Sequence, residues 1–488
     1  MFQKIKQTAK HTSIFALGKI STKLVGFILL PIYTKEISVA DFGILGLLEV
    51  IDLLGSNVLS IGMPQALLRW HSLADNAFKK RKIVFTTFFF LFLVFSCSLI
   101  LVSPFKESLS SALFNKPQYG YFIIYVFISI SFANLARIPQ AILRIEEKSL
   151  YYSLTILGQF TISLFLNIYF VAFRKLGVEG ILIANIISNG LLLISLLPYL
   201  IKRMIFKFDA QLLREMLTFS YPFIFIALST TILSLGDRYI LTKLSTLSQV
   251  GLYSLGYKIS NVVKIFVVDS FTLGLPIIGW QLVKDNERPK EYLAKIFTYL
   301  SFVLLWLGLI ISIHARALIQ VFALNADYWD AYQVIPFLIL GVVLLGWQQH
   351  LFFILQIPKK TKQISVILAI AAVSNIIANI ILIPDYNMMG AAYATIISFF
   401  IAFLLALIAV YKYYPIKFEI KRILLLICTA LIIFIISLYI NTPYPMINIF
   451  LKILLSLIYP AILFMVPFYK DDEKKKMREI ISGIFKSR

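Results

Sequence analysis

The sequence predicts an all-α polytopic membrane protein with about 14 transmembrane helices. Of its 488 residues, 60% are hydrophobic and 14% are charged, whereas charged residues make up about 25% of a soluble domain. The mean hydropathy of +0.87 is far above that of a soluble chain. Apolar runs of about 20 residues, the length that crosses about 30 Å of hydrocarbon, recur along the whole sequence. Functional groups are therefore expected between helices or at helix ends.

The apolar runs define the predicted spans in order. No connection between them exceeds about twenty residues, so no separate soluble domain is expected. The predicted spans lie near residues 13–33, 42–66, 83–103, 119–142, 152–173, 177–201, 217–241, 250–279, 293–313, 334–357, 364–383, 390–411, 421–440 and 448–469.

Loop charges orient these helices, because cytoplasmic loops carry an excess of Lys and Arg. With the N-terminus inside, most loop cations lie on the inner side, and both termini are predicted to be cytoplasmic. The formal net charge of +22 then reflects topology and contact with anionic lipid of the bilayer, not nucleic-acid binding. The outer loops hold only Lys35, Lys106, Lys116, Arg174, Lys175, Lys243 and Arg316.

An internal repeat divides the chain. Ile32, Thr34, Lys35, Gly43 and Leu47 recur as Ile240, Thr242, Lys243, Gly251 and Leu255, an offset of about 210 residues that spans six helices. An even number of spans gives both halves the same orientation, with the substrate path at their interface. We expect an N-terminal six-helix lobe (1–208), a C-terminal six-helix lobe (209–418), transmembrane helices 13 and 14 (419–470) and a cytoplasmic amphipathic tail (471–488).

Five of the basic residues inside predicted spans are candidates for substrate binding, because a charge at the bilayer centre costs roughly 2.5 to 3.5 kcal/mol and so marks a polar interior. Lys19 and Lys23 stand four apart on the first span and share a helix face. Arg137 lies on the fourth span, and Lys258 and Lys264 lie on the eighth. We expect them to line a cavity that binds an anionic substrate, Arg through forked bonds to phosphate and Lys as a point charge. Snorkelling to an interface is the alternative for some of them.

Acidic residues in the spans offer ion pairing as a second interpretation. Glu49 and Asp52 on the second span would neutralise the lysine pair of the first span, and Asp269 would neutralise the second lysine of the eighth. Asp237 and Arg238 lie near the outer end of the seventh span, where they either close the cavity as a gate or cap the helix. These five residues are the gating and coupling candidates.

Enzymatic alternatives find little support. A membrane polymerase or ligase would need a sizeable outer loop with acid, base or phosphate-binding groups, and the outer loops are short. Gly18-Lys19 lacks the upstream glycine of a phosphate-binding loop. Cys97 and Cys428 both lie inside apolar runs, and no His-Glu-x-x-His pattern occurs. We expect no catalytic residue, no metal site and no cofactor.

Several short motifs, in their order and spacing, resemble the polysaccharide-biosynthesis (O-antigen type) flippases of the multidrug/oligosaccharidyl-lipid/polysaccharide exporter superfamily. The resemblance covers almost the whole chain. The motifs are the Asp41-Phe42-Gly43 entry to the second span, Asp237-Arg238-Tyr239-Ile240-Leu241, Gly251-Leu252-Tyr253-Ser254, Tyr257-Lys258, and Gly390-Ala391-Ala392-Tyr393-Ala394-Thr395 at the twelfth span.

The resemblance implies two six-helix lobes that form a V around a central cavity. It also implies transfer of undecaprenyl-pyrophosphate-linked oligosaccharide from the inner to the outer leaflet of the bacterial plasma membrane, for a surface polysaccharide such as lipopolysaccharide O-antigen, with a polysaccharide polymerase as partner. Fourteen spans depart from the twelve-span members, which leaves a peptidoglycan-precursor flippase open. A cation-coupled drug exporter also stays open, although its pocket should carry net acidic groups where Lys19 and Lys23 stand.

Overall fold

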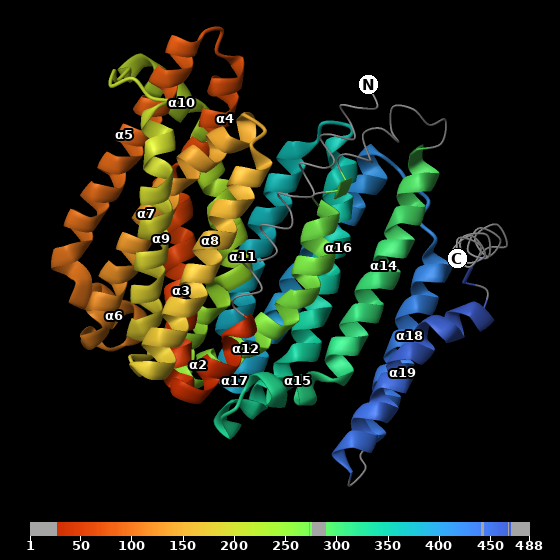
Figure 1. The fold of residues 1–488 in the computed structure, drawn as a ribbon. Helices are drawn as coiled ribbons and strands as arrows, with labels where there is room; N and C mark the ends of the chain where they lie inside the picture. Colours follow the sequence, from red (N-terminus) through yellow and green to blue (C-terminus); the bar gives the residue numbers. More distant parts are fainter. Residues whose placement is uncertain (1–26, 273, 276–288, 441–443, 467, 470–488) are drawn as a thin grey trace, which may run out of the picture. The chain divides into compact units, whose positions relative to one another are not determined.

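The computed structural model describes all residues except 1–26, 273, 276–288, 441–443, 467 and 470–488 (Figure 1). Every regular element in this part of the chain is a helix. The elements up to residue 269 are α2 (Leu30–Glu36), α3 (Val39–Ser60), α4 (Met63–Leu73), α5 (Ala77–Val102), η1 (Ser103–Phe105), α6 (Lys106–Phe114), η2 (Pro117–Tyr119), α7 (Gly120–Ile145), α8 (Ser149–Asn167), η3 (Ile168–Phe173), α9 (Gly177–Ile201), α10 (Ala210–Ser220), α11 (Pro222–Leu244), α12 (Leu247–Val263) and η4 (Lys264–Asp269). The later elements are α14 (Pro289–Ile313), α15 (Ala315–Phe322), η5 (Ala326–Val334), α16 (Ile335–Gln356), α17 (Thr361–Tyr413), α18 (Ile420–Tyr439) and α19 (Pro445–Met465).

The helices match the predicted spans closely. Among the described residues, 11 helical segments are long and apolar enough to cross a membrane. One of them, α17, covers the two predicted spans at 364–383 and 390–411, and it bends between them at Asn387 (φ 49°, ψ −127°). The predicted spans at 13–33 and 250–279 lie partly outside the described residues, as do Lys19, Lys23 and the predicted tail at 471–488. The all-α, multi-pass membrane class is confirmed.

The chain forms two compact units, and the boundaries between them fall inside helices. The first unit contains the residues up to Leu255 together with Gln320–Asp330 and Ala372–Ala394. The second unit contains Gly256–Ile319, Ala331–Ala371 and the residues from Thr395 onward. Both α12 and α17 therefore contribute to each unit. The lobes at 1–208 and 209–418 stay a prediction.

In the first unit, α7 packs against α3, α5, α8 and α9. Since lipid is as apolar as the side chains, helices in a membrane associate through close packing of small residues and through hydrogen bonds. The closest approach lies between α3 and the start of α12: a Cβ added to Gly43 would stand 2.1 Å from the Leu247 carbonyl oxygen, and one on Gly251 would stand 2.0 Å from that of Val39. The two helices therefore touch backbone to backbone.

In the second unit, α14 packs on α16 and carries the last two helices, α18 and α19. Trp306 Nε1 donates to the Ser456 carbonyl across 3.0 Å, and the Tyr459 hydroxyl donates to the Leu426 carbonyl across 3.1 Å. At one end of α18, Arg422 Nη1 pairs with Glu419 at 2.8 Å. These bonds and an aromatic core fix the two C-terminal helices to α14.

Candidate functional site

A buried set of charged and polar side chains joins three helices of the first unit. Arg238 on α11 is 1% exposed, and its Nη1 donates to Glu49 Oε2 on α3 at 3.0 Å and to the Gly46 carbonyl at 3.1 Å. Beside it, buried Asp237 accepts a hydrogen bond from the Tyr253 hydroxyl on α12. We call Glu49, Asp237, Arg238 and Tyr253 the buried charge set. Two acidic side chains and one basic side chain thus meet between these helices; Asp237 and Arg238 are buried, and Glu49 is partly exposed.

Small residues make this arrangement sterically feasible. A Cβ at position 46 would stand 2.3 Å from Ser254 Oγ and 3.8 Å from Arg238 Nη1. Without a side chain there, the Gly46 carbonyl can face the guanidinium and α12 can approach α3. Asp237 and Arg238 lie more than a turn before the end of α11 at Leu244, so neither caps that helix.

Arg137 lies inside α7, eight residues before its last residue, with an exposed side chain. It is about 12 Å from the end of α7 at Ile145, at 1.5 Å per residue. Its Nη1 donates to Asn134 Oδ1 at 2.7 Å, and Asn134 Nδ2 donates to Ser56 Oγ on α3 at 2.8 Å. Asp52, also exposed, acts electrostatically on Arg137. An arginine is therefore held inside this helix, where its remaining donors can meet a ligand.

Further polar side chains bridge neighbouring helices of the first unit. Gln159 Nε2 on α8 donates to Asn189 Oδ1 on α9 at 2.6 Å, and Asn189 Nδ2 donates to Ser129 Oγ on α7 at 2.9 Å. Such groups bond to one another across helices because lipid offers them no partner. These amide and hydroxyl groups in the first unit are of a kind that can form hydrogen bonds with sugar hydroxyls.

In the second unit, Lys264 and Asp269 form an ion pair at 2.9 Å. Both residues belong to η4, a π-helix that continues α12. Lys258 lies on α12 and is half-buried.

The described structure thus brings some predicted site residues together and separates others. Glu49, which the sequence offered as a partner for the first-span lysines, pairs with Arg238. Arg137 and Asp52 interact electrostatically in the first unit, while Lys258, Lys264 and Asp269 lie in the second. Lys19 and Lys23 lie outside the described residues, so their role stays a prediction.

Sequence reasoning missed several polar positions. Ser56 is nearly buried and accepts a hydrogen bond from Asn134, the side chain that in turn accepts one from Arg137. On α16, Gln348 and His350 are fully buried, and His350 Nε2 lies 3.1 Å from the Leu293 carbonyl. The available signal was a polar residue in an otherwise apolar span, which a count of charges overlooks.

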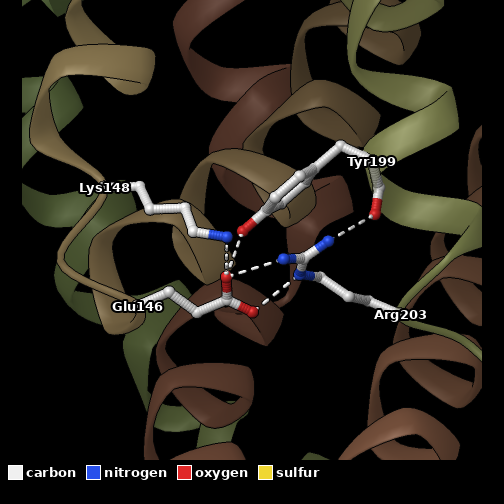
Figure 2. Close-up of polar contacts among 4 residues, drawn as sticks. All are labelled: Glu146, Lys148, Tyr199 and Arg203. Atoms are coloured by element: carbon white, nitrogen blue, oxygen red, sulfur yellow. Dashed lines mark hydrogen bonds and ion pairs between the residues drawn. The ribbon is translucent and has the colours of Figure 1, made fainter.

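A second polar cluster lies where α7 ends and α9 ends, on the predicted cytoplasmic side (Figure 2). Arg203 donates two hydrogen bonds to the Glu146 carboxylate, from Nε (2.6 Å) and Nη2 (2.9 Å). Its guanidinium also lies 3.7 Å from the centre of the Tyr199 ring. Lys148 Nζ and the Tyr199 hydroxyl also reach Glu146, at 2.7 and 2.8 Å. The hydrogen bond from Arg203, supported by those from Lys148 and Tyr199, lowers the pKa of Glu146 to about 2. This cluster ties the turn after α7 to α9.

The part of the chain that the structure describes contains no group of three or more His, Cys, Asp or Glu side chains that could hold a metal ion.

Comparison with solved structures identifies the fold. The chain is similar to the lipid II flippase MurJ in an inward closed conformation, with a TM-score of 0.77, 18% identity, and 92% of this chain and 98% of that one covered. It is also similar to an inward-facing multidrug resistance MATE family transporter of the MOP superfamily, with a TM-score of 0.65, 14% identity, and 82% and 98% coverage. The chain therefore shares its fold with these two proteins.

Sequence comparisons agree. An uncharacterised membrane protein of Haemophilus influenzae is 22% identical over 405 residues, which are 78% of this chain and 94% of that protein. A family model described as polysaccharide biosynthesis protein matches residues 35–322. The resemblance stated from the motifs is confirmed: the chain belongs to this polysaccharide biosynthesis family.

Proposed function

We propose that the protein is a flippase that moves undecaprenyl-pyrophosphate-linked oligosaccharide from the inner to the outer leaflet of the bacterial plasma membrane. The observation that carries this proposal is Arg137, an exposed cation inside a membrane-crossing helix, hydrogen-bonded to Asn134 and acted on electrostatically by Asp52. A charge is retained there only where it serves a polar path. Membership in a polysaccharide biosynthesis family supports a glycan-bearing substrate.

The chemistry of the site suits a diphosphate linkage that carries sugars. In the first unit Arg137 can offer forked hydrogen bonds to a phosphate; in the second unit Lys258 and Lys264 can offer point charges. Lys19 and Lys23 would complete the basic path. Bridging amides such as Gln159 and Asn189 would exchange their interhelical bonds for bonds to sugar hydroxyls.

Alternating access needs a resting state that the substrate can replace. In this proposal the pairs Glu49–Arg238 and Lys264–Asp269 stabilise the resting state, because each neutralises a cation while the anionic substrate is absent. Asp52 neutralises Arg137 in the same state. The anionic substrate binds these cations in place of the acidic residues. The equilibrium then shifts away from the resting state.

The protein would act in the inner membrane with both termini cytoplasmic, upstream of a polysaccharide polymerase that consumes the exported oligosaccharide. It would be a transporter and not an enzyme.

A peptidoglycan-precursor flippase is the second candidate. The fold likeness to the lipid II flippase extends over 92% of this chain, against 82% for the MATE transporter. Both candidate substrates share the pyrophosphate linkage and differ in the glycan. A drug exporter for cations fits less well, because Arg137 would repel a cationic ligand.

A complementation experiment tests the proposal. In cells that lack this protein, Arg137→Ala should abolish surface glycan at an unchanged level of protein in the membrane, and Arg137→Lys should restore part of it, because Lys keeps the charge but not the fork. Lys452→Ala is the matched control, since Lys452 lies near the start of α19 and is assigned no role; it should leave the glycan normal. Normal glycan with Arg137→Ala would contradict the proposal.

Rescue of cells depleted of their peptidoglycan-precursor flippase, without any effect on surface glycan, would favour the second candidate.

A further inference from the structure

The Lys264–Asp269 pair depends on an unusual helix geometry. The two residues are five positions apart, and in an α-helix a residue five positions on lies about 140° around the axis and about 7.5 Å along it. Charged pairs on α-helices therefore form at spacings of three or four. Residues Lys264–Asp269 instead form a π-helix, in which hydrogen bonds join residues five apart. The 2.9 Å contact exists because of that turn.

A neighbouring contact repeats the same spacing. The Ser270 hydroxyl donates to the Ile265 carbonyl across 3.3 Å, again five positions back. Immediately afterwards, Thr272 Oγ1 donates to the Val268 carbonyl four positions back, at 2.8 Å. The wide turn is thus confined to one short stretch, and the chain resumes ordinary spacing beyond it.

The first unit supplies a natural comparison. There η3 (Ile168–Phe173) is also a π-helix, and the Arg174 amide donates to the Tyr169 carbonyl five positions back at 2.9 Å. Its first and last residues, Ile168 and Phe173, are apolar where η4 has Lys264 and Asp269. A π-helical turn that begins and ends on opposite charges is therefore a property of η4 and not of η3.

The pair is open to a competing ligand. The side chains of Lys264 and Asp269 are 27% and 31% exposed, whereas those of the structural pair Arg422–Glu419 are 9% and 15% exposed. Because both side chains are partly exposed, an anion of higher charge can reach Lys264 and compete with Asp269 for it. A diphosphate is such an anion.

Loss of the pair would change the register of the segment. A π-turn holds one more residue than an α-turn, and it is the less favourable helix of the two. If it converts, the residues that follow rotate by about 100° and move by about 1.5 Å relative to α12, which is one α-helical step. Val268 contacts Gly346 of α16 and the Phe271 ring lies 5.8 Å from that of His350, so this step would repack η4 against α16.

We propose that η4 is an anion-sensitive switch: the diphosphate of the substrate binds Lys264 in place of Asp269, and the π-turn then converts to α-helix. This rests on the proposed function in that the ligand is the linkage of the transported lipid. When the anion replaces Asp269 at Lys264, the residues that follow Asp269 rotate. Anion binding would thereby change the packing within the second unit.

A disulfide reports the state of the turn without touching the charged pair. Cysteines are placed at Ile265 and Ser270 in a protein with Cys97→Ser and Cys428→Ser, because the π-turn brings these positions together, as the bond from the Ser270 hydroxyl to the Ile265 carbonyl shows. In an α-helix their Cα atoms would be about 8.6 Å apart, beyond the limit of about 7 Å for a disulfide. We expect inorganic pyrophosphate to slow bridge formation in the purified protein at least about fivefold, compared with sodium chloride of equal ionic strength. Adding Asp269→Asn should slow it without ligand, and adding Lys264→Gln should remove the pyrophosphate effect.

The matched control places cysteines at Tyr169 and Arg174, the corresponding positions of η3. Their bridging rate should not respond to pyrophosphate. An Ile265/Ser270 bridging rate that pyrophosphate leaves unchanged would overturn the switch, whether or not the protein transports lipid. Conversely, a slowed rate in a protein that fails to move pyrophosphate-linked lipid would support the switch and contradict the proposed function.

Discussion

Arg238 Nη1 lies 3.0 Å from Glu49 Oε2 although 189 positions separate the two residues. The guanidinium is 1% exposed and the carboxylate is on a side chain that is 37% exposed. The partners therefore differ in what their removal leaves behind: without Glu49 a buried guanidinium loses one acidic partner, and without Arg238 a partly exposed anion can turn to water.

That asymmetry predicts unequal effects of substitution. Glu49→Ala should destabilise the protein by about 2 kcal/mol, less than the roughly 3 to 5 kcal/mol for a fully buried pair because Glu49 is partly exposed. Arg238→Met should cost less, and the double variant should be no less stable than Glu49→Ala alone. Thermal unfolding of the purified variants measures this. Equal unfolding temperatures for wild type and Glu49→Ala would show that the pair does not stabilise the fold.

The contact of α3 with α12 predicts the effect of adding a single methyl group. Gly43→Ala or Gly251→Ala should each destabilise the protein by about 1 to 3 kcal/mol, because the new Cβ would overlap a backbone carbonyl of the other helix. Gly158→Ala in α8 is the control, since nothing lies within 4 Å of its added Cβ. There alanine should stabilise the helix by about 0.5 to 1 kcal/mol. Unfolding temperatures that fall equally for all three variants would rule out the close approach as the cause.

The cluster in Figure 2 predicts a pH dependence. The pKa of Glu146 in the folded protein, about 2, lies below its ordinary value of 4.5. The charged carboxylate therefore stabilises the fold above about pH 4.5, and this contribution is lost as the pH falls toward 2. At pH 7, Glu146→Gln should cost about 1 kcal/mol, because the cluster is partly open to solvent. The difference from wild type should shrink between pH 4.5 and pH 3.

Glu147→Gln provides the control for that series. Glu147 is the exposed neighbour in the same turn, and its substitution should change stability little at any pH. A wild-type and Glu146→Gln difference that stays constant from pH 7 to pH 3 would mean that the effect does not come from the charge of Glu146.

The loop charges predict the orientation of the chain. In a protein with Cys97→Ser and Cys428→Ser, single cysteines at Lys116 and Asp327 should react with an impermeant thiol reagent applied to intact cells. Cysteines at Asp75 and Thr361 should react only after the membrane is opened. The reverse pattern would place both termini outside and contradict the direction of transport proposed above.

The membrane-crossing helices were predictable because the bilayer fixes their length and composition. The 11 described segments follow the predicted runs, and even the two spans inside α17 were separated near the bend at Asn387. Contacts between helices were not predictable in the same way. Glu49 meets Arg238 because Gly43, Gly46 and Gly251 let three helices approach, and spacing along the chain does not reveal such a contact.

The Lys264–Asp269 contact shows both the reach and the limit of sequence reasoning. Their proximity in the chain suggested an ion pair. A spacing of five does not fit an α-helix, and the hydropathy pattern gives no sign of a π-turn, so the geometry that unites them emerged from the structure alone. The sequence predicted Arg137 as a cation within a membrane span. It did not predict the hydrogen bonds through Asn134 and Ser56 that position this side chain.

Transport of a pyrophosphate-linked oligosaccharide lipid by the purified protein in liposomes tests the central claim most directly. The linkage carries about two negative charges, and each charge moved across 100 mV is worth about 2.3 kcal/mol. The wild-type protein should move the lipid, faster when the side that corresponds to the cell exterior is positive, and Arg137→Ala should not. A lipid that stays in its leaflet with the wild-type protein, or crosses equally well with Arg137→Ala, would contradict the account.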